Sequence, residues 1–297
     1  MSECIKWESV IPNFQQGDVI IPFESYFKRK READYILDGG INHHDTLEAC
    51  ASVRRKSSQQ VGVYNQNGRQ IVPEEFDNCE LVIYNSGDFY VTAIKVQKDG
   101  LYGLYNRNGK MIVPTQFIGI DVSDYFIVVR DKNELYGAYL TDGRKIIECE
   151  YDTIEVAGSL DEGFGYAIIS QKGLFGVRLE TGNEIIPVRF DYIKKEFDRY
   201  GYIVYDMTSK THSLNGWYSQ DGRSNIPCLF ETIKFQHEEI LVETPEGLKG
   251  IYSYEGKEII PPKFKSINQI GEFIVCLIED DNLFVYDYEG TCLYHTI

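Results

Sequence analysis

The side chains that could bind a metal or act as nucleophiles are few and scattered along the chain. His43 and His44 are followed by Asp45, and imidazole and carboxylate groups are ordinary metal ligands. Neighbouring residues, however, point in different directions on either a helix or a strand, and no nearby Cys or His completes a ligand set. Cys50 has no positioned base that would make its thiol a nucleophile. We therefore predict a protein without a metal site, a cofactor or catalytic residues.

The charge of the chain restricts the kinds of partner that it can bind. Its 30 basic and 46 acidic residues give a formal net charge of -16. Most of such a surface repels nucleic-acid phosphate and anionic lipid, so we expect neither nucleic acid nor a membrane as partner and favour a basic protein. The alternative is that the acidic surface only keeps the protein soluble.

The cysteines and the first residues predict a cellular compartment. Seven cysteines contain no Cys-x-x-Cys pair, and an odd number cannot close completely into intramolecular disulfides. The stretch from Met1 to Trp7 has no apolar run of the kind found in a secretory signal or a membrane span. We expect the protein to be cytoplasmic.

Any binding residues must be positioned by a repeat that fills most of the sequence, with turn glycines 34 to 41 residues apart. The turn glycines of six copies are Gly68, Gly109, Gly143, Gly182, Gly222 and Gly256. Six residues before them stand Gly62, Gly103, Gly137, Gly176, Gly216 and Gly250. Five residues after them stand Pro73, Pro114, Pro187, Pro227 and Pro261, with Glu148 in the third copy. Three residues further on stand Phe76, Phe117, Tyr151, Phe190, Phe230 and Phe264.

This pattern predicts a β-hairpin followed by further strands in each copy. In the clearest copy, strands from Leu101 to Asn106 and from Lys110 to Val113 flank an Asn-Gly turn that tolerates positive φ. Proline cannot donate to a ladder, so we expect it to end the second strand or to lie on an edge. The aromatic residue should then enter the interior against the next unit. With a further apolar strand such as 125–130, each unit supplies three or four short strands.

Repeats of this length must stack, because no single unit can bury its own apolar face. The last copy reaches its turn at Gly290, and the segment from Gly17 to Pro22 offers the half that this copy lacks. One blade assembled from both ends would close a ring and remove its open edges. The fold class that we expect is therefore all-β, a closed propeller-like ring of about seven blades in one domain, 1–297. An open β-solenoid is the alternative.

At these residues the chain resembles the WG-repeat family, also called KWG, over nearly all of the stretch from Gln60 to Gly290. The positions of the family's tryptophan hold Val61, Tyr102, Tyr136, Phe175, Asn215 and Lys249, so three units lack an aromatic side chain there. The resemblance implies a non-catalytic binding module, mostly found in bacteria. It also implies an association with immunity proteins that neutralise toxins, and it supplies no catalytic residue.

A basic segment near residues 28–58 interrupts the repeat, with a net charge of +2 between Lys28 and Lys56. We predict a helical insertion here, capped by Asp45 and ending in basic residues that complement the helix dipole. Its apolar stripe would contain Leu47, Cys50, Ala51 and Val53. Arg29, Arg31, Arg54 and Arg55 form a second candidate partner contact. The alternative is a helix that only packs against the acidic body.

The longer copies gain their extra residues between the interior aromatic residue and the next glycine. The additions lie at 84–89, 155–164 and 194–200, which equivalent blades would present on one side. Rings supply anchors and carboxylates steer association with a basic protein. The candidate partner-binding residues are Asp88, Phe89, Asp161, Glu162, Phe164, Asp198 and Tyr200. Loop drift without function is the alternative.

The leading hypothesis is a protein-binding module, in its most concrete form an immunity-type protein whose acidic face covers a basic toxin. A small-molecule or carbohydrate sensor that uses the opening of the ring is the second hypothesis. An enzyme of an unrecognised type is the third, and it would require a cleft of carboxylates with shifted pKa values.

Overall fold

The protein is all-β over the residues that its computed structural model describes, with no helix among them. Those residues are 35–40, 50–55, 57–65, 69–86, 89–123, 125–159, 164–196, 201–207, 213–236, 239–278 and 282–296. The chain forms two compact units, Met1–Gly165 and Tyr166–Ile297. Strands β1 to β13 belong to the first unit and β15 to β28 to the second, with the division inside β14. The expectation of a single domain stays a prediction.

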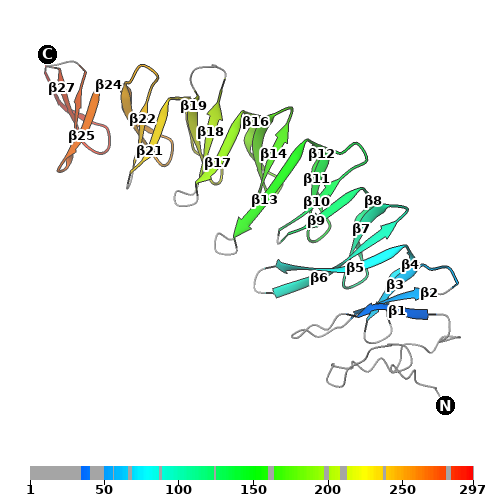
Figure 1. Cartoon of the computed structure of the whole chain (residues 1–297). Coiled ribbons are helices and arrows are strands. Elements are labelled where there is room, and N and C mark those ends of the chain that lie inside the picture. Colours follow the sequence, from blue (N-terminus) through cyan, green and yellow to red (C-terminus); the bar gives the residue numbers. More distant parts are fainter. Residues whose placement is uncertain are drawn as a thin grey trace. The chain divides into compact units, whose positions relative to one another are not determined.

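Seven four-stranded sheets follow one another along the chain, and Figure 1 shows their strands in chain order. The first three contain β1 (Tyr35–Gly40), β2 (Cys50–Arg55), β3 (Val61–Asn65), β4 (Gln70–Phe76); β5 (Asn78–Ser86), β6 (Phe89–Lys98), β7 (Leu101–Asn106), β8 (Met111–Phe117); and β9 (Gly119–Val122), β10 (Phe126–Arg130), β11 (Tyr136–Leu140), β12 (Lys145–Tyr151). The fourth and fifth contain β13 (Thr153–Ser159), β14 (Phe164–Gln171), β15 (Leu174–Leu179), β16 (Glu184–Phe190); and β17 (Tyr192–Glu196), β18 (Gly201–Asp206), β19 (Leu214–Ser219), β20 (Asn225–Phe230). The last two contain β21 (Thr232–Phe235), β22 (Glu239–Glu243), β23 (Lys249–Ser253), β24 (Glu258–Phe264); and β25 (Ser266–Ile270), β26 (Phe273–Leu277), β27 (Leu283–Tyr286), β28 (Cys292–His295).

Each sheet is an antiparallel meander in which consecutive strands are neighbours. Because the chain reverses at every turn, the first hairpin and the turn between the third and fourth strands lie at the same end of a sheet. We call this end the tip end. The turn between the second and third strands lies at the opposite end. Turn glycines such as Gly143, with φ of 92°, therefore lie at the tip end, where glycine adopts the left-handed region without strain.

The fourth strand lies on the edge of its sheet and contains the repeated proline, which confirms the edge position. The strand does not end there, because β8 continues through Pro114 to Phe117. A bulge accommodates the proline: between the pairs Tyr102↔Phe117 and Leu104↔Val113, the single residue Gly103 faces three residues. A Cβ on Gly103 would lie 2.9 Å from the Cα of Thr115, so the bulge explains the first repeated glycine.

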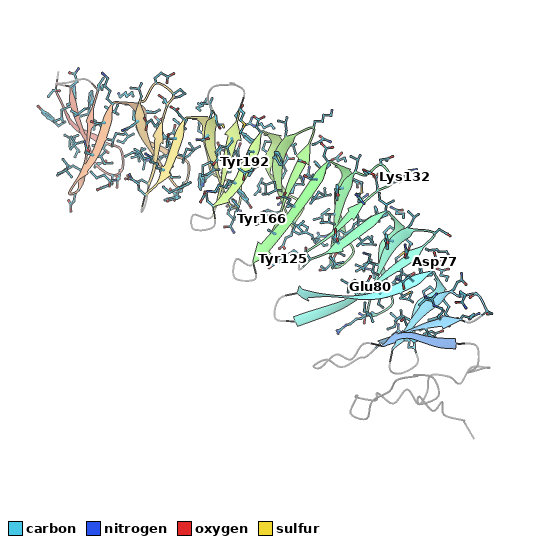
Figure 2. The ribbon with its side chains drawn as sticks, viewed as in Figure 1. Asp77, Glu80, Tyr125, Lys132, Tyr166 and Tyr192 are labelled. Carbon is cyan, nitrogen blue, oxygen red and sulfur yellow. The ribbon has the colours of Figure 1, made fainter. Side chains whose placement is uncertain are left out.

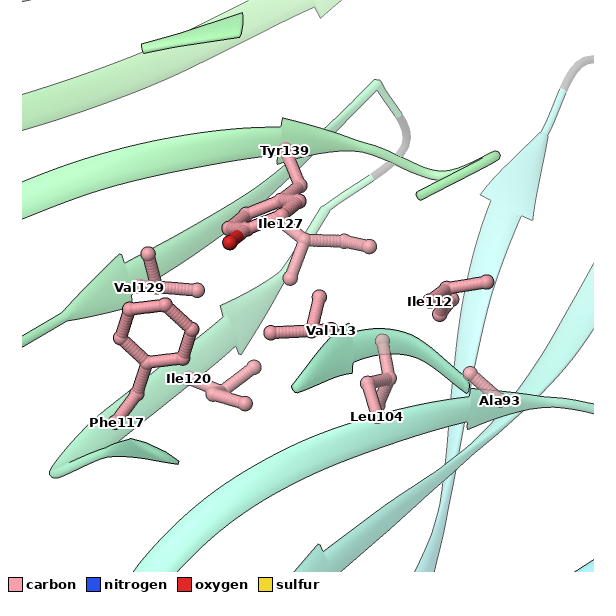
Figure 3. Packing of buried hydrophobic residues seen from close by; sticks show 9 residues of the cluster. All are labelled: Ala93, Leu104, Ile112, Val113, Phe117, Ile120, Ile127, Val129 and Tyr139. Atoms are coloured by element: carbon pink, nitrogen blue, oxygen red, sulfur yellow. The ribbon is translucent and has the colours of Figure 1, made fainter. Parts of the chain in front are cut away.

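The core lies between the faces of consecutive sheets. In the first unit, Leu104, Val113 and Phe117 of the second sheet pack against Ile127 and Tyr139 of the third (Figure 3). The repeated aromatic residue is buried in every copy, as the sequence predicted. Within each unit it meets a tyrosine of the next sheet edge to face, with ring centroids 5.7 to 6.0 Å apart, a geometry that stabilises aromatic pairs. The pairs are Phe76–Tyr105, Phe117–Tyr139, Phe190–Tyr218, Phe230–Tyr252 and Phe264–Tyr286.

The predicted helical insertion at 28–58 is wrong where the structure describes it. Tyr35–Gly40 is strand β1 and Cys50–Arg55 is strand β2. The residues of β2 pair one by one with β3, and Val53, opposite Gly62, is buried. Burial against neighbouring strands outweighs the weak helical pattern of this short segment. Asp45 and Leu47 lie outside the described residues.

The predicted composite blade is also corrected. The β25–β28 sheet obtains its fourth strand locally, from Cys292–His295, and does not require the segment from Gly17 to Pro22. That segment lies outside the described residues. We expected the copy to stop before a fourth strand, but four residues after the turn suffice to pair with β27. Among the described residues there is no helix long and apolar enough to cross a membrane.

Candidate functional site

The three predicted insertions occupy the same position in their sheets, namely the tip of the first hairpin. They connect β5 to β6, β13 to β14 and β17 to β18. Phe89 begins β6, which pairs with β5 up to Ser86↔Phe89, and Phe164 begins β14. The other candidates, Asp88, Asp161, Glu162, Asp198 and Tyr200, lie outside the described residues. The structure thus shows that the insertions are topologically equivalent and describes the strands that carry them.

An aromatic ring supports the base of the β13–β14 hairpin. Gly158 and Gly165 lie beside each other on the two strands, and Tyr125 lies against both. A Cβ would come within 2.7 Å of the Tyr125 ring at Gly158 and within 2.6 Å at Gly165. The two glycines therefore let the ring approach the backbone just below the tip that contains Asp161 and Glu162 (Figure 2 labels Tyr125).

A buried lysine occupies the base of the β17–β18 hairpin. The Lys195 ammonium lies 4.7 Å from the ring centroid of Tyr202 and 5.2 Å from that of Tyr166, which Figure 2 labels. The two rings are themselves 5.6 Å apart in an edge-to-face arrangement, and all three residues are buried. Such cation–π contacts are stronger when water is excluded. They fix the strand that leads into Asp198 and Tyr200.

Further aromatic side chains lie near the tip end of this sheet and of the β21–β24 sheet that follows it. A Cβ on Gly201 would lie 2.4 Å from the indole nitrogen of Trp217, so glycine is required at the start of β18. The Trp217 ring meets Tyr254 edge to face at 6.1 Å, and Tyr254 stacks on Phe235 at 6.3 Å. The Tyr254 hydroxyl donates to the carbonyl of Gln236 at 2.9 Å and so ties the glycine turn to the first hairpin.

The same contact recurs one sheet later. The Tyr288 hydroxyl donates to the carbonyl of Gly271 at 3.1 Å, again between the glycine turn and the tip of the first hairpin. A glutamate follows each tyrosine, Glu255 and Glu289, and both are exposed. A hydrogen bond from the Ser253 hydroxyl holds the pKa of Glu255 below its ordinary value, so this carboxylate is ionised at neutral pH. Rings and carboxylates therefore occur together at the tip end.

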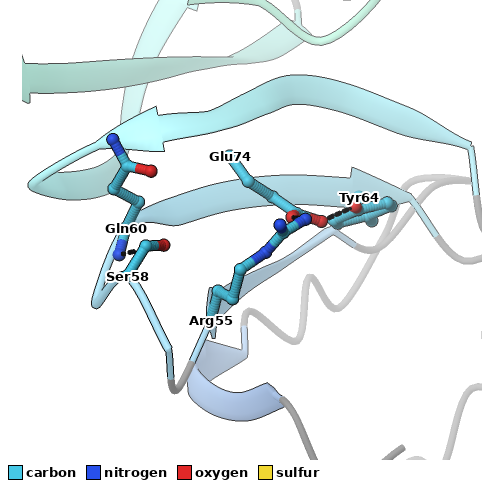
Figure 4. A network of polar contacts seen from close by, with 5 residues as sticks. All are labelled: Arg55, Ser58, Gln60, Tyr64 and Glu74. Atoms are coloured by element: carbon cyan, nitrogen blue, oxygen red, sulfur yellow. Dashed lines mark hydrogen bonds and ion pairs between the residues drawn. The ribbon is translucent and has the colours of Figure 1, made fainter. Parts of the chain in front are cut away.

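Arg54 and Arg55 make contacts inside the protein. The Arg54 guanidinium donates to the carbonyls of Gln59, at 2.7 Å, and Asp77, at 3.4 Å. Arg55 forms an ion pair with Glu74, which also accepts a hydrogen bond from Tyr64 (Figure 4). Both arginines thus stabilise the first sheet, and a role in binding a partner stays a prediction. Arg29 and Arg31 lie outside the described residues.

The described part of the chain shows no group of His, Cys, Asp and Glu that could hold a metal ion. His43 and His44 fall outside that part. Burial raises the pKa of Cys228 and of Cys276 to about 11. Neither thiol is therefore ionised at neutral pH, and neither has the thiolate character of a nucleophile.

Sequence reasoning missed the residues that support the hairpins: Tyr125, Tyr166, Lys195, Tyr202 and Trp217. One signal was available for part of the tip end, since Tyr254-Glu255-Gly256 and Tyr288-Glu289-Gly290 repeat the same three residues at the turn. No comparable sequence signal marks Lys195, because its partners come from another strand of its own sheet and from the preceding sheet.

Comparisons with known proteins address the family. A comparison with curated proteins finds no match. Among solved structures, the chain is similar to BamB from Moraxella catarrhalis, at 8% identity over 88% of this chain and 91% of that one, with a TM-score of 0.27. It is also similar to the computationally designed protein Ika8, at 10% identity over 86% and 85% of the chains and a TM-score of 0.24. At such TM-scores neither likeness carries an argument. The family model of the WG containing repeat matches residues 102–129, so the chain contains a repeat of this family.

Proposed function

We propose that this protein is a non-catalytic protein-binding module that recognises a basic partner. In its most concrete form, it is a bacterial immunity-type protein that covers the active surface of a basic toxin. The proposal also includes a cytoplasmic location and the absence of nucleic-acid and membrane partners.

The observation that carries the proposal is the tip end. Three long first hairpins lie at equivalent positions in their sheets, and their sequences contain Asp88, Asp161, Glu162 and Asp198 beside aromatic residues. Packed side chains fix the base of two of these hairpins, Tyr125 in one and Lys195 in the other. A rigid scaffold with variable acidic and aromatic tips suits recognition of a basic protein surface, because binding loses little conformational entropy.

Co-expression with a basic toxin encoded beside this chain tests the proposal. We expect growth to be restored by the intact chain and a complex with a Kd at or below about 1 μM, measured by calorimetry on the purified pair. Replacing Asp161 and Glu162 by lysine should weaken the complex about tenfold or more. If the native cell yields no stable protein partner by cross-linking and affinity purification, the proposal fails.

A finer architecture belongs to the same proposal: a closed, propeller-like ring of about seven blades, with an open solenoid as the alternative. Seven sheets of four strands support a count of seven. Small-angle X-ray scattering distinguishes the two forms, because an open array gives a larger radius of gyration and maximum dimension than a ring of equal mass. A profile that fits only an elongated particle would exclude the ring.

A further inference from the structure

Two Asn-Gly dipeptides lie among the described residues, and the fold places them in opposite surroundings. Asn108 and Gly109 belong to the turn between β7 and β8, whereas Asn215 and Gly216 lie within strand β19. Glycine after an asparagine leaves its backbone nitrogen with the least steric hindrance toward the asparagine side-chain amide, because glycine has no Cβ. The same two residues can therefore react in one place and be protected in the other.

The Asn108 side chain is exposed, and its amide forms no hydrogen bond within the described part of the chain. Its backbone N–H donates to Oδ1 of Asn106 at 3.0 Å, and its carbonyl accepts from the Arg69 guanidinium at 3.4 Å. The Gly109 N–H donates to the Asn106 carbonyl at 3.0 Å. A single bond of this kind in an exposed turn opens at a low free-energy cost. The Gly109 nitrogen then becomes available to the Asn108 side chain.

Asn215, in contrast, is held on every side. Its strand pairs with both β18 and β20, so the backbone is interior to the sheet. The side-chain amide nitrogen of Asn215 donates to the carbonyl of Glu231 at 2.7 Å, which fixes the side chain. A Cβ on Gly216 would lie 2.9 Å from the Cα of Cys228, so the backbone has no room to turn. A reaction between Asn215 and Gly216 therefore requires the sheet to open first.

We propose that Asn108 is a site of spontaneous deamidation in the native protein and that Asn215 is protected from it. The Gly109 nitrogen loses its proton to hydroxide and attacks Cγ of Asn108. The bond between the Gly109 nitrogen and Cγ forms, the Cγ–Nδ2 bond breaks, and Nδ2 leaves as ammonia after taking a proton from water. Hydrolysis of the resulting succinimide consumes one water molecule and gives aspartate or isoaspartate. The reaction is not a redox step, and it does not depend on the proposed function.

The two products differ in how well they fit the turn. Aspartate fits, because Asp142 and Asp221 precede the turn glycine in two other copies and accept the N–H of the residue two positions later, at 2.8 and 3.0 Å. Isoaspartate instead adds one carbon to the main chain. A Cβ on Gly109 would already lie 3.0 Å from the carbonyl oxygen of Ile71, in the preceding sheet, so the turn has little room for a longer main chain. We expect isoaspartate to weaken the packing of the second sheet on the first, whereas aspartate only adds a negative charge at the tip end.

Peptide mapping of the full chain tests the site. The native protein is incubated at pH 8, and mass spectrometry of proteolytic fragments follows both asparagines over time. We expect deamidation at Asn108 to be at least about tenfold faster than at Asn215, because the sheet must open before Asn215 reacts. The rate at Asn108 should fall at pH 6, since the attacking nitrogen must lose its proton. In urea, which removes the fold, the two rates should agree within about twofold, because both asparagines precede glycine.

Two variants at position 108 separate the effects of the two products. Asn108→Asp contains the first product from the start and should melt at the same temperature as the unmodified protein. Asn108→Thr introduces the residue type that Thr181 supplies in the fourth copy, and it cannot deamidate at this position. After incubation, the original chain should contain isoaspartate and melt at a lower temperature than the equally incubated Asn108→Thr variant.

The rates and the melting temperatures each have an outcome that contradicts the proposal. Equal rates at Asn108 and Asn215 in the native protein would overturn the site, as would no reaction at Asn108 while the chain in urea reacts. Equal melting temperatures of the two incubated chains, with isoaspartate present at position 108, would overturn its effect on the packing against Ile71.

Discussion

The β21–β24 and β25–β28 sheets have the same strand order but differ in their fourth strands. In the first, β24 contains Pro261 and a bulge opposite Gly250, and it ends at the buried Phe264. In the second, β28 is short and every residue of it is exposed, while Phe284 stands at the position of the glycine. The bulged fourth strand therefore explains the repeated glycine. Where the fourth strand lacks this bulge and its proline, a residue as large as Phe284 is tolerated at the glycine's position.

The largest difference between the two sheets should appear at the aromatic residue. Phe264 is fully buried and meets Phe284 and Tyr286, with ring centroids 5.4 and 6.0 Å away. Phe264→Ala should lower the free energy of unfolding by about 4 kcal/mol, because it leaves a cavity and loses two ring contacts. Tyr294→Ala, on the exposed face, should change it by no more than about 0.5 kcal/mol. Urea denaturation measures both, and similar losses would contradict the comparison.

A smaller loss should follow from filling the space at Gly250. A Cβ there would lie 2.8 Å from the carbonyl oxygen of Ile260 and 2.8 Å from the Cα of Pro262, both backbone atoms that cannot rotate away. Gly250→Ala should therefore destabilise the protein by about 2 to 3 kcal/mol. Gly271→Ala is the control, because it measures only the backbone strain of placing alanine at a positive φ. The φ of Gly271 is 61°, and a Cβ there would meet no atom within 4 Å. Equal losses would argue against the close approach.

Two tyrosines at the same position of the repeat, Tyr252 and Tyr286, should contribute differently to the loss of stability at alkaline pH. The Tyr252 hydroxyl donates to Glu258 at 3.1 Å, and burial together with this carboxylate raises the pKa of Tyr252 to about 12. A tyrosine in the unfolded chain ionises near pH 10, whereas the folded protein keeps the Tyr252 hydroxyl neutral. The contribution of this neutral hydroxyl to the free energy of unfolding is therefore complete below pH 10 and is lost as the pH rises to 12. Tyr252→Phe should reduce that loss by about 1 to 2 kcal/mol.

Tyr286 serves as the comparison. Burial raises its pKa as well, but its neighbour is Cys292 instead of a glutamate. Tyr286→Phe should reduce the alkaline loss less than Tyr252→Phe does. Urea denaturation at pH 9, 10, 11 and 12 follows both variants. An alkaline loss that Tyr252→Phe leaves unchanged would rule out this tyrosine as its source.

The smallest effect is a difference in reactivity between two thiols of the β25–β28 sheet, Cys276 and Cys292. It is measured on the unchanged protein and involves no loss of stability. Cys276 is buried and burial raises its pKa to about 11, whereas Cys292 is exposed. Iodoacetamide at pH 8 should alkylate Cys292 within minutes to hours and Cys276 only after denaturation, because the thiolate is the reactive form. Mass spectrometry of proteolytic fragments locates the label. Rapid labelling of Cys276 in the native protein would show that this sheet opens easily.

The sequence allowed the repeated elements to be predicted because their reasons are local. Turn glycines must adopt positive φ, and the aromatic residue after each proline had to be buried. The helix predicted around Cys50 failed because the apolar positions of a short segment fit a strand as well as a helix, and pairing with β3 decided between them. The proline was placed correctly on an edge, but its bulge was not foreseen, because a bulge depends on how two strands meet.

For the candidate site, the sequence located the longer hairpins but not what supports them. Tyr125 lies under two glycines of the next sheet, and Lys195 lies between rings of β14 and β18. Tyr125 and Tyr166 come from the sheet before that of the residues they contact, and no fixed spacing relates them to those residues.

By itself, the sequence determined the repeat, its turns, its buried aromatic residues and its acidic charge, because each depends on residue type and short spacing. The tertiary structure alone decided which face of each sheet is covered. The same apolar position is buried at Ile260 and exposed at Tyr294. Burial depends on what packs against a side chain, and the residues on its own strand do not determine that.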